Sequence, residues 1–128
     1  MTRITDLANI AAQEKKAGNR EEALSLYSEA FDILVKEAMR YALKYEDATE
    51  KVDGELVART EFKNKVKEYY RKDEVACRIS NNMGVLFVEL GNVQAAKDMF
   101  TQAIDLTPIG VTYEDPVESL HLLETVTN

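Results

Sequence analysis

Apolar residues recur every three or four positions through the first third of the chain. The clearest stripe consists of Ala23, Tyr27, Ala30, Leu34, Ala38 and Ala42. This spacing is that of one face of a helix, and no glycine or proline interrupts it before Asp53-Gly54. Asn19 can cap this helix, and Thr2 can cap a shorter helix that precedes it. The pattern predicts a helix hairpin over about residues 3–52.

A second stripe follows in the middle of the chain. Its members are Phe62, Val66, Tyr69, Ala76, Met83 and Phe87. The helix could continue to Gly91 or break near Lys72-Asp73, where the stripe thins, and we favour a break. We therefore expect a long connecting helix over about residues 55–76 and a second hairpin over about 77–108.

The C-terminal segment carries the start signals of one more helix. Asp115 is a candidate cap, and Pro116 suits a first helical turn. The helix over about residues 116–126 then presents Leu120, Leu122, Leu123 and Val126. The whole chain, residues 1–128, is predicted to be one all-α domain.

The chain also contains an internal repeat with an offset of 73 residues. The matching pairs are Gly18 and Gly91, Asn19 and Asn92, Ala23 and Ala96, Tyr27 and Phe100, and Ala30 and Ala103. A glycine permits a tight turn between antiparallel helices. Small alanines let two helix axes approach closely, and the aromatic side chain fills the space beside them.

The second copy resembles the tetratricopeptide repeat, a helix hairpin that stacks into solenoids. The matching positions are Gly84, Phe87, Gly91, Ala96, Phe100, Ala103 and Pro108. The first copy matches at Leu7, Ala11, Gly18, Ala23, Tyr27 and Ala30. It departs from the motif at Glu14, where an aromatic residue is usual, and residues 38–76 lengthen it beyond an ordinary repeat. The resemblance implies antiparallel hairpins with an extended first hairpin.

The N-terminal half also resembles an MIT domain, a three-helix module of membrane-trafficking proteins that binds amphipathic tails. This likeness rests on the alanines and Gly18 of the first hairpin and on the segment Phe62 to Tyr69. The cleaner second copy favours the tetratricopeptide interpretation.

The tetratricopeptide resemblance implies a concave face that holds a peptide. Asn9 and Asn82 occupy equivalent positions on that face, where a side-chain amide can both donate to and accept from a peptide backbone. The flanking positions are Lys15, Lys16, Arg78, Asn81 and Glu89. The alternative is that both asparagines are ordinary exposed helix residues.

Two further details bear on the partner. Ala8 and Ala12 stand where chaperone-binding members of the family carry a carboxylate clamp, which argues against chaperone tails as ligands. The last helix either caps the apolar edge of the second repeat, as solenoids require, or docks into a partner. Capping is the favoured interpretation.

Charge narrows the class of partner. The formal net charge is −7, and an acidic protein repels phosphate backbones. The densest basic run is Lys63, Lys65, Lys67, Arg71 and Lys72, and acids interleave it, which is typical of a salt-bridged helix surface. We expect another protein as partner rather than nucleic acid, with a homo-oligomer or a self-associating structural subunit as a further possibility.

Nothing in the sequence suggests catalysis. The chain has one histidine, His121, and one cysteine, Cys77, too few for a nucleophile–base pair or a usual zinc site, and the glycines form no phosphate loop. No apolar run is long enough for a membrane span, and a lone cysteine fits a reducing compartment. We predict a cytoplasmic, non-enzymatic interaction module without metal or cofactor.

Overall fold

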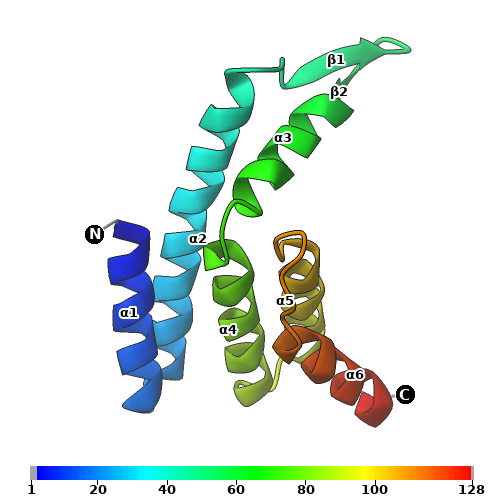
Figure 1. Cartoon of the computed structure of the whole chain (residues 1–128). Coiled ribbons are helices and arrows are strands. Elements are labelled where there is room, and N and C mark those ends of the chain that lie inside the picture. Colours follow the sequence, from blue (N-terminus) through cyan, green and yellow to red (C-terminus); the bar gives the residue numbers. More distant parts are fainter. Residues whose placement is uncertain (1–2, 128) are drawn as a thin grey trace.

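Residues 3–127, which the computed structural model describes, form six helices and one small antiparallel sheet (Figure 1). In chain order the elements are α1 Arg3–Lys16, α2 Arg20–Leu43, β1 Thr49–Val52, β2 Glu55–Ala58, α3 Thr60–Tyr70, α4 Val75–Glu89, α5 Val93–Asp105 and α6 Asp115–Thr127. The predicted all-α class is confirmed. Thr2, expected to cap α1, lies outside the described residues.

Two antiparallel hairpins, α1–α2 and α4–α5, form the body of the molecule, with α4 packed beside α2 and α6 packed on α5 (Figure 1). Their contact surfaces include several small side chains. Ala11, Ala23, Ala30, Ala96 and Ala103 are all fully buried. The two hairpins therefore pack closely, because these alanines let the helix axes approach. The buried Tyr27, Leu86 and Phe100 fill the space beside them.

The tight turns follow the sequence signals with one exception. Gly18 and Gly91 adopt φ values of +88° and +83°, a region that other residues enter only at a cost. Asn92 caps α5, since its side chain accepts a hydrogen bond from the Ala95 N–H at 3.1 Å. Asn19 does not cap α2 in this way. Its amide instead donates to the Glu14 carboxylate at 2.7 Å, which ties the turn back to α1.

The helix predicted to reach residue 52 ends earlier, at Leu43. A β-hairpin follows, in which β1 pairs with β2 around Asp53 and Gly54. These two residues have φ values of +52° and +84°, the signature of the turn that suits the twist of a two-stranded hairpin. The Asp-Gly pair thus closes a β-hairpin instead of ending a long helix. The helices predicted to extend through residues 44–52 and 55–58 were wrong.

The predicted connecting helix over residues 55–76 is shorter than expected. It begins only at Thr60 and ends at Tyr70, and the next helix begins at Val75. The helix break predicted near Lys72-Asp73 is therefore confirmed. Asp73 accepts a hydrogen bond from the Val75 N–H at 3.0 Å and so favours a new helix start.

The first hairpin is extended by the far half of α2, the β-hairpin and α3. Contacts between α2 and α3 hold this extension together. The Tyr69 hydroxyl donates to the Glu37 carboxylate at 2.9 Å, and the Tyr70 ring stacks on Phe31 with centroids 5.9 Å apart. As Figure 1 shows, the far half of α2, the β-hairpin and α3 project beyond the other helices. The hairpin tip is exposed on both strands.

Because the hairpin buries none of its side chains, we expect it to contribute little to stability. Leu56→Ser, at a side chain that is 70% exposed, should change the free energy of unfolding by less than about 0.5 kcal/mol. Leu86→Ala, at a fully buried leucine of α4, should reduce it by about 2–5 kcal/mol. Urea unfolding followed by circular dichroism measures both. Equal losses would show that the hairpin packs against the body.

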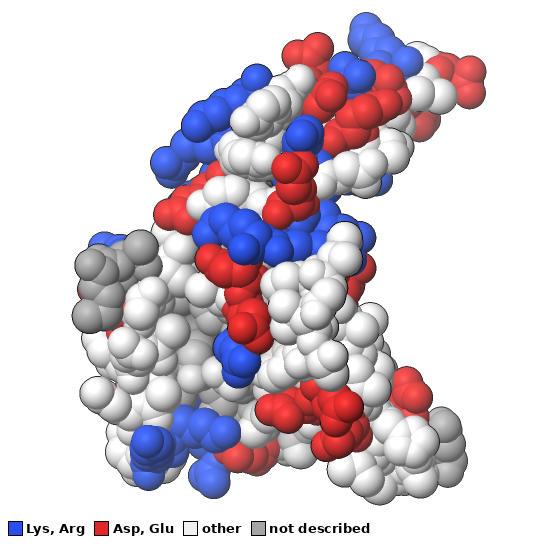
Figure 2. All heavy atoms as spheres, viewed as in Figure 1, with Lys and Arg blue, Asp and Glu red and all other residues white. Residues whose placement is uncertain are grey.

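Charge is distributed unevenly over the surface. In the view of Figure 2, basic and acidic atoms alternate over α3 and the β-hairpin, whereas the surface over α6 shows acidic and uncharged atoms only. None of the helices in the described part of the chain is both long and apolar enough to span a membrane.

Candidate peptide-binding face

A first groove lies between α1 and α4, with a volume of about 240 Å³. Its lining is Thr5, Ala8, Asn9, Ala12, Tyr27, Val75, Arg78, Ile79 and Asn82. Asn9 comes from α1 and Asn82 from α4, at the positions that the repeat makes equivalent. The structure therefore brings the two predicted asparagines to the same groove.

Asn82 is anchored by the floor of this groove. Its Nδ2 donates to the Tyr27 hydroxyl at 3.3 Å, and Tyr27 is buried. Burial raises the pKa of the Tyr27 phenol, although the Asn82 hydrogen bond lowers it, so the hydroxyl stays protonated at neutral pH. This contact uses one of the two amide donors of Asn82, which leaves the second donor and the carbonyl oxygen for a ligand.

Arg78 lies at one end of the first groove. Its guanidinium pairs with the Glu74 carboxylate at 2.9 Å, one helical turn earlier. The same group lies 4.9 Å from the centre of the Tyr113 ring, a geometry that is favourable for a cation. These contacts fix the position of a positive charge beside the two asparagines.

Asn81 does not flank the groove as predicted. It is only 6% exposed, and its Oδ1 has no hydrogen-bond partner among the described residues. One residue along a helix corresponds to a rotation of about 100°, which turns Asn81 away from the face that carries Asn82 and into the protein.

The remaining predicted residues lie towards the turns of the hairpins. The Glu89 carboxylate pairs with Arg20 at 2.8 Å and with Lys15 at 3.9 Å, so these residues connect α1 and α2 to α4. Neither Lys15 nor Glu89 lines the first groove. Lys16 is exposed at the end of α1. Arg20 was not predicted, because no motif marks it and only the packed hairpins bring it to Glu89.

A second groove, not predicted from sequence, lies between α4 and α6. It has a volume of about 310 Å³ and is lined by Val85, Val88, Glu89, Phe100, Ser119, Leu122 and Leu123. Its floor is Phe100, the repeat equivalent of Tyr27 below the first groove. The two grooves thus lie on either side of α4, one polar and one apolar.

α6 only partly covers the edge of the second hairpin. Leu120 and Leu123 are half-buried, whereas Leu122 and Val126 are 63% and 80% exposed. The helix therefore packs on α5 and leaves apolar side chains towards the second groove.

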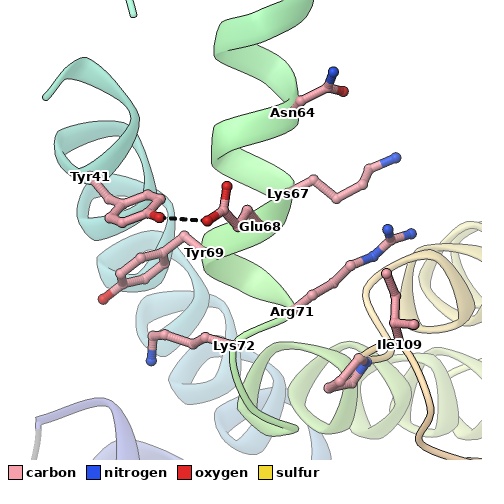
Figure 3. A pocket seen from close by; sticks show the side chains of 9 residues that line it. Tyr41, Asn64, Lys67, Glu68, Tyr69, Arg71, Lys72 and Ile109 are labelled. Carbon is pink, nitrogen blue, oxygen red and sulfur yellow. Dashed lines mark hydrogen bonds between the residues drawn. The ribbon is translucent and has the colours of Figure 1, made fainter. Parts of the chain in front are cut away.

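A third cleft, of about 820 Å³, lies between α3 and the loop after α5 (Figure 3). Its lining includes Lys67, Arg71 and the exposed Ile109. Lys67 and Arg71 both pair with Asp105, at 3.2 and 3.4 Å. Tyr41 and Glu68 also line it, and the Tyr41 hydroxyl donates to the Glu68 carboxylate at 2.8 Å.

Four members of the basic run, which continues from α3 into the turn after it, form ion pairs within the chain: Lys65, Lys67, Arg71 and Lys72. Lys65 pairs with Glu68 at 3.1 Å, and Lys72 with Asp73 at 3.0 Å. Because these pairs are mostly exposed, each contributes little to the stability of the fold. The salt-bridged surface predicted for this run is confirmed, and the cleft presents little uncompensated charge.

The described residues include no group of three or more His, Cys, Asp or Glu side chains placed to hold a metal ion. His121 is exposed on α6. Cys77 is fully buried in α4, and its thiol donates to the Glu74 carbonyl oxygen at 3.3 Å.

Cys77 should react slowly with thiol reagents. Burial raises the pKa of the Cys77 thiol, so the reactive thiolate is scarce below that raised pKa and increases only at higher pH. At pH 8, labelling by a disulfide reagent should be at least about a hundredfold slower in buffer than in 6 M urea, because reaction requires local opening. Labelling in buffer at the rate of the unfolded chain would contradict this burial.

No protein-family model matches the chain, and no curated protein is similar enough to it to count as a match. The role of the grooved face is therefore inferred from its residues and their geometry.

Proposed function

We propose that this chain is a non-enzymatic adaptor of the tetratricopeptide type, which binds an extended segment of another protein across the face formed by α1, α4 and α6. The observation that carries the proposal is that Asn9 and Asn82, equivalent residues of two repeated hairpins, line one groove.

The chemistry of the groove suits a peptide backbone. An extended chain exposes N–H and C=O groups at regular intervals, and a side-chain amide matches both. Asn82 is held in place by Tyr27, so little side-chain freedom is lost on binding. Ala8 and Ala12 keep the α1 wall low, which leaves room for a backbone to approach.

The proposal includes a setting inside the cell. A single cysteine that is buried is compatible with a reducing compartment, and we place the adaptor in the cytoplasm.

A peptide selection against the full chain tests the proposal. Twelve-residue peptides displayed on phage are selected on the immobilised protein, and the affinities of synthetic copies are measured by fluorescence anisotropy. A hydrogen bond contributes about 0.5–1.5 kcal/mol, so Asn9→Ala with Asn82→Ala should weaken binding by roughly five- to a hundredfold. Asn64→Ala, on exposed α3, is the matched control and should change nothing.

Three results would contradict the proposal. The double variant could bind as tightly as the original chain, which would exclude the two amides. Peptides that bind only between α2 and α3, as mapped by chemical shifts, would instead support an MIT-like trafficking module. A molecular mass in light scattering that increases with concentration, with no peptide selected, would support a self-associating structural subunit.

A further inference from the structure

The second groove differs from the first in its chemistry, although the repeat makes the two equivalent. Tyr27 below the first groove corresponds to Phe100 below the second, and Ala12 corresponds to Val85. The second groove thus lacks the phenol hydroxyl of the first, and a larger apolar side chain replaces an alanine. α6 adds Leu122 and Leu123 on the opposite wall.

This groove leaves apolar surface in water. Leu122 is 63% exposed and Val88 is 41% exposed. The volume of about 310 Å³ is roughly twice that of an apolar cavity known to hold benzene, about 150 Å³. The space therefore suits one or two aliphatic side chains of a ligand. Such side chains would cover Leu122, Val85 and Val88 and remove their apolar surface from water.

The surroundings of the groove are acidic. From residue 98 to the end, the chain has six Asp or Glu residues and no Lys or Arg. Glu118 and Glu124 lie on α6 beside the groove residues Ser119 and Leu123 but do not line the groove. Glu89, which does line it, pairs with Arg20 and Lys15. Glu118 and Glu124 are exposed, and the surface over α6 shows no basic atoms in Figure 2. Such a surface attracts positive charge.

The charge also argues against two other occupants. A symmetric dimer through this groove would place two acidic surfaces together, and like charges across an interface are unfavourable. The basic run of this chain, on α3, is packed against α2 and paired with Asp105 and other acids. The chemistry therefore favours a basic segment of a different protein.

We infer that the groove between α4 and α6 receives an aliphatic side chain from a partner segment that carries Lys or Arg on both sides of it. This inference rests on the proposed function, because the same extended segment would cross α4 from the first groove. Packed helices lie about 8–10 Å apart, and an extended chain advances about 3.3 Å per residue. The aliphatic residue therefore lies about three positions from the backbone held by Asn82.

The test uses the full chain with isotope-labelled methyl groups and synthetic 12-residue peptides. The first peptide contains one leucine flanked on each side by two lysines in a serine–glycine background. A second replaces the four lysines by glutamates, and a third replaces the leucine by serine. Methyl signals of Val85, Val88, Leu122 and Leu123 report the second groove, and the side-chain amide signals of Asn9 and Asn82 report the first.

We expect the lysine peptide to shift the four methyl signals in a saturable manner. The glutamate and serine peptides should bind at least about tenfold more weakly. Leu122→Ser and the pair Glu118→Lys with Glu124→Lys should each reduce the affinity of the lysine peptide by about fivefold or more. Leu56→Ser, at an equally exposed leucine outside the groove, is the control and should leave it unchanged.

The two sets of signals separate the possible failures. Shifts of the asparagine amides with unmoved methyl signals would overturn this inference and leave the proposed function standing. Shifted methyl signals with unmoved amides would instead contradict the backbone-holding role of the first groove. Equal binding of the lysine and glutamate peptides would overturn the preference for a basic segment.

Discussion

Replacement of Gly84 by alanine is expected to destabilise the protein by about 1–3 kcal/mol, even though alanine favours a helix by about 1 kcal/mol over glycine. A Cβ atom at Gly84 would lie 2.6 Å from Cε1 of Phe100. The Phe100 ring is 1% exposed, so its packing leaves it little room to move away from Gly84. The missing side chain of Gly84 is what lets α5 approach α4.

The sign of this effect should depend on Phe100. Phe100→Ala alone should lower the free energy of unfolding by about 3–5 kcal/mol. In that background the space above Gly84 is open, and Gly84→Ala should be neutral or stabilising. Urea unfolding of the four proteins in this cycle measures the coupling. The same loss from Gly84→Ala in both backgrounds would show that the two residues do not interlock.

The second large effect concerns the small residues that the two hairpins share. Ala30→Leu and Ala103→Leu should each cost about 1–3 kcal/mol, because both alanines are fully buried between helices. Unfolding in urea, monitored by circular dichroism, gives the two free energies.

Two controls separate crowding from helix propensity. Ser25→Leu on α2 and Thr101→Leu on α5 place the same side chain on exposed positions of the same helices. These changes should be neutral within about 0.5 kcal/mol. If the buried and exposed leucines had equal effects, the alanines would not be needed for close packing.

The helical body could be predicted because its signals are local and strong. The stripe through Ala23 and Tyr27 repeats with the period of a helix, and the shared offset identified the second hairpin independently. Asn92 caps α5 as predicted, whereas the Asn19 side chain donates a hydrogen bond to Glu14 instead. The choice between two partners for one side chain depends on tertiary proximity, which the sequence does not specify.

The β-hairpin was missed for a physical reason. A strand is usually recognised by alternating apolar and polar residues, which reflect one buried face. All residues of β1 and β2 are exposed, so no such alternation was selected. The remaining signals were Asp53-Gly54 and the β-branched Thr49, Val52 and Val57, and the Asp-Gly pair was interpreted only as a helix breaker.

The candidate site was partly predictable. The repeat offset places Asn9 and Asn82 on the same face without any structure, because equivalent residues of stacked hairpins face the same way. The second groove could not be found in this manner. It forms only when α6 packs on α5, and the angle at which Leu122 meets Val85 depends on that packing.

The most direct test of the peptide-binding face is a crystal structure of the full chain with a selected peptide. The proposed role requires the peptide to cross α4, with its backbone at Asn82 and an aliphatic side chain above Phe100. A peptide found along α2 and α5, or in the cleft beside Arg71 and Ile109, would contradict it.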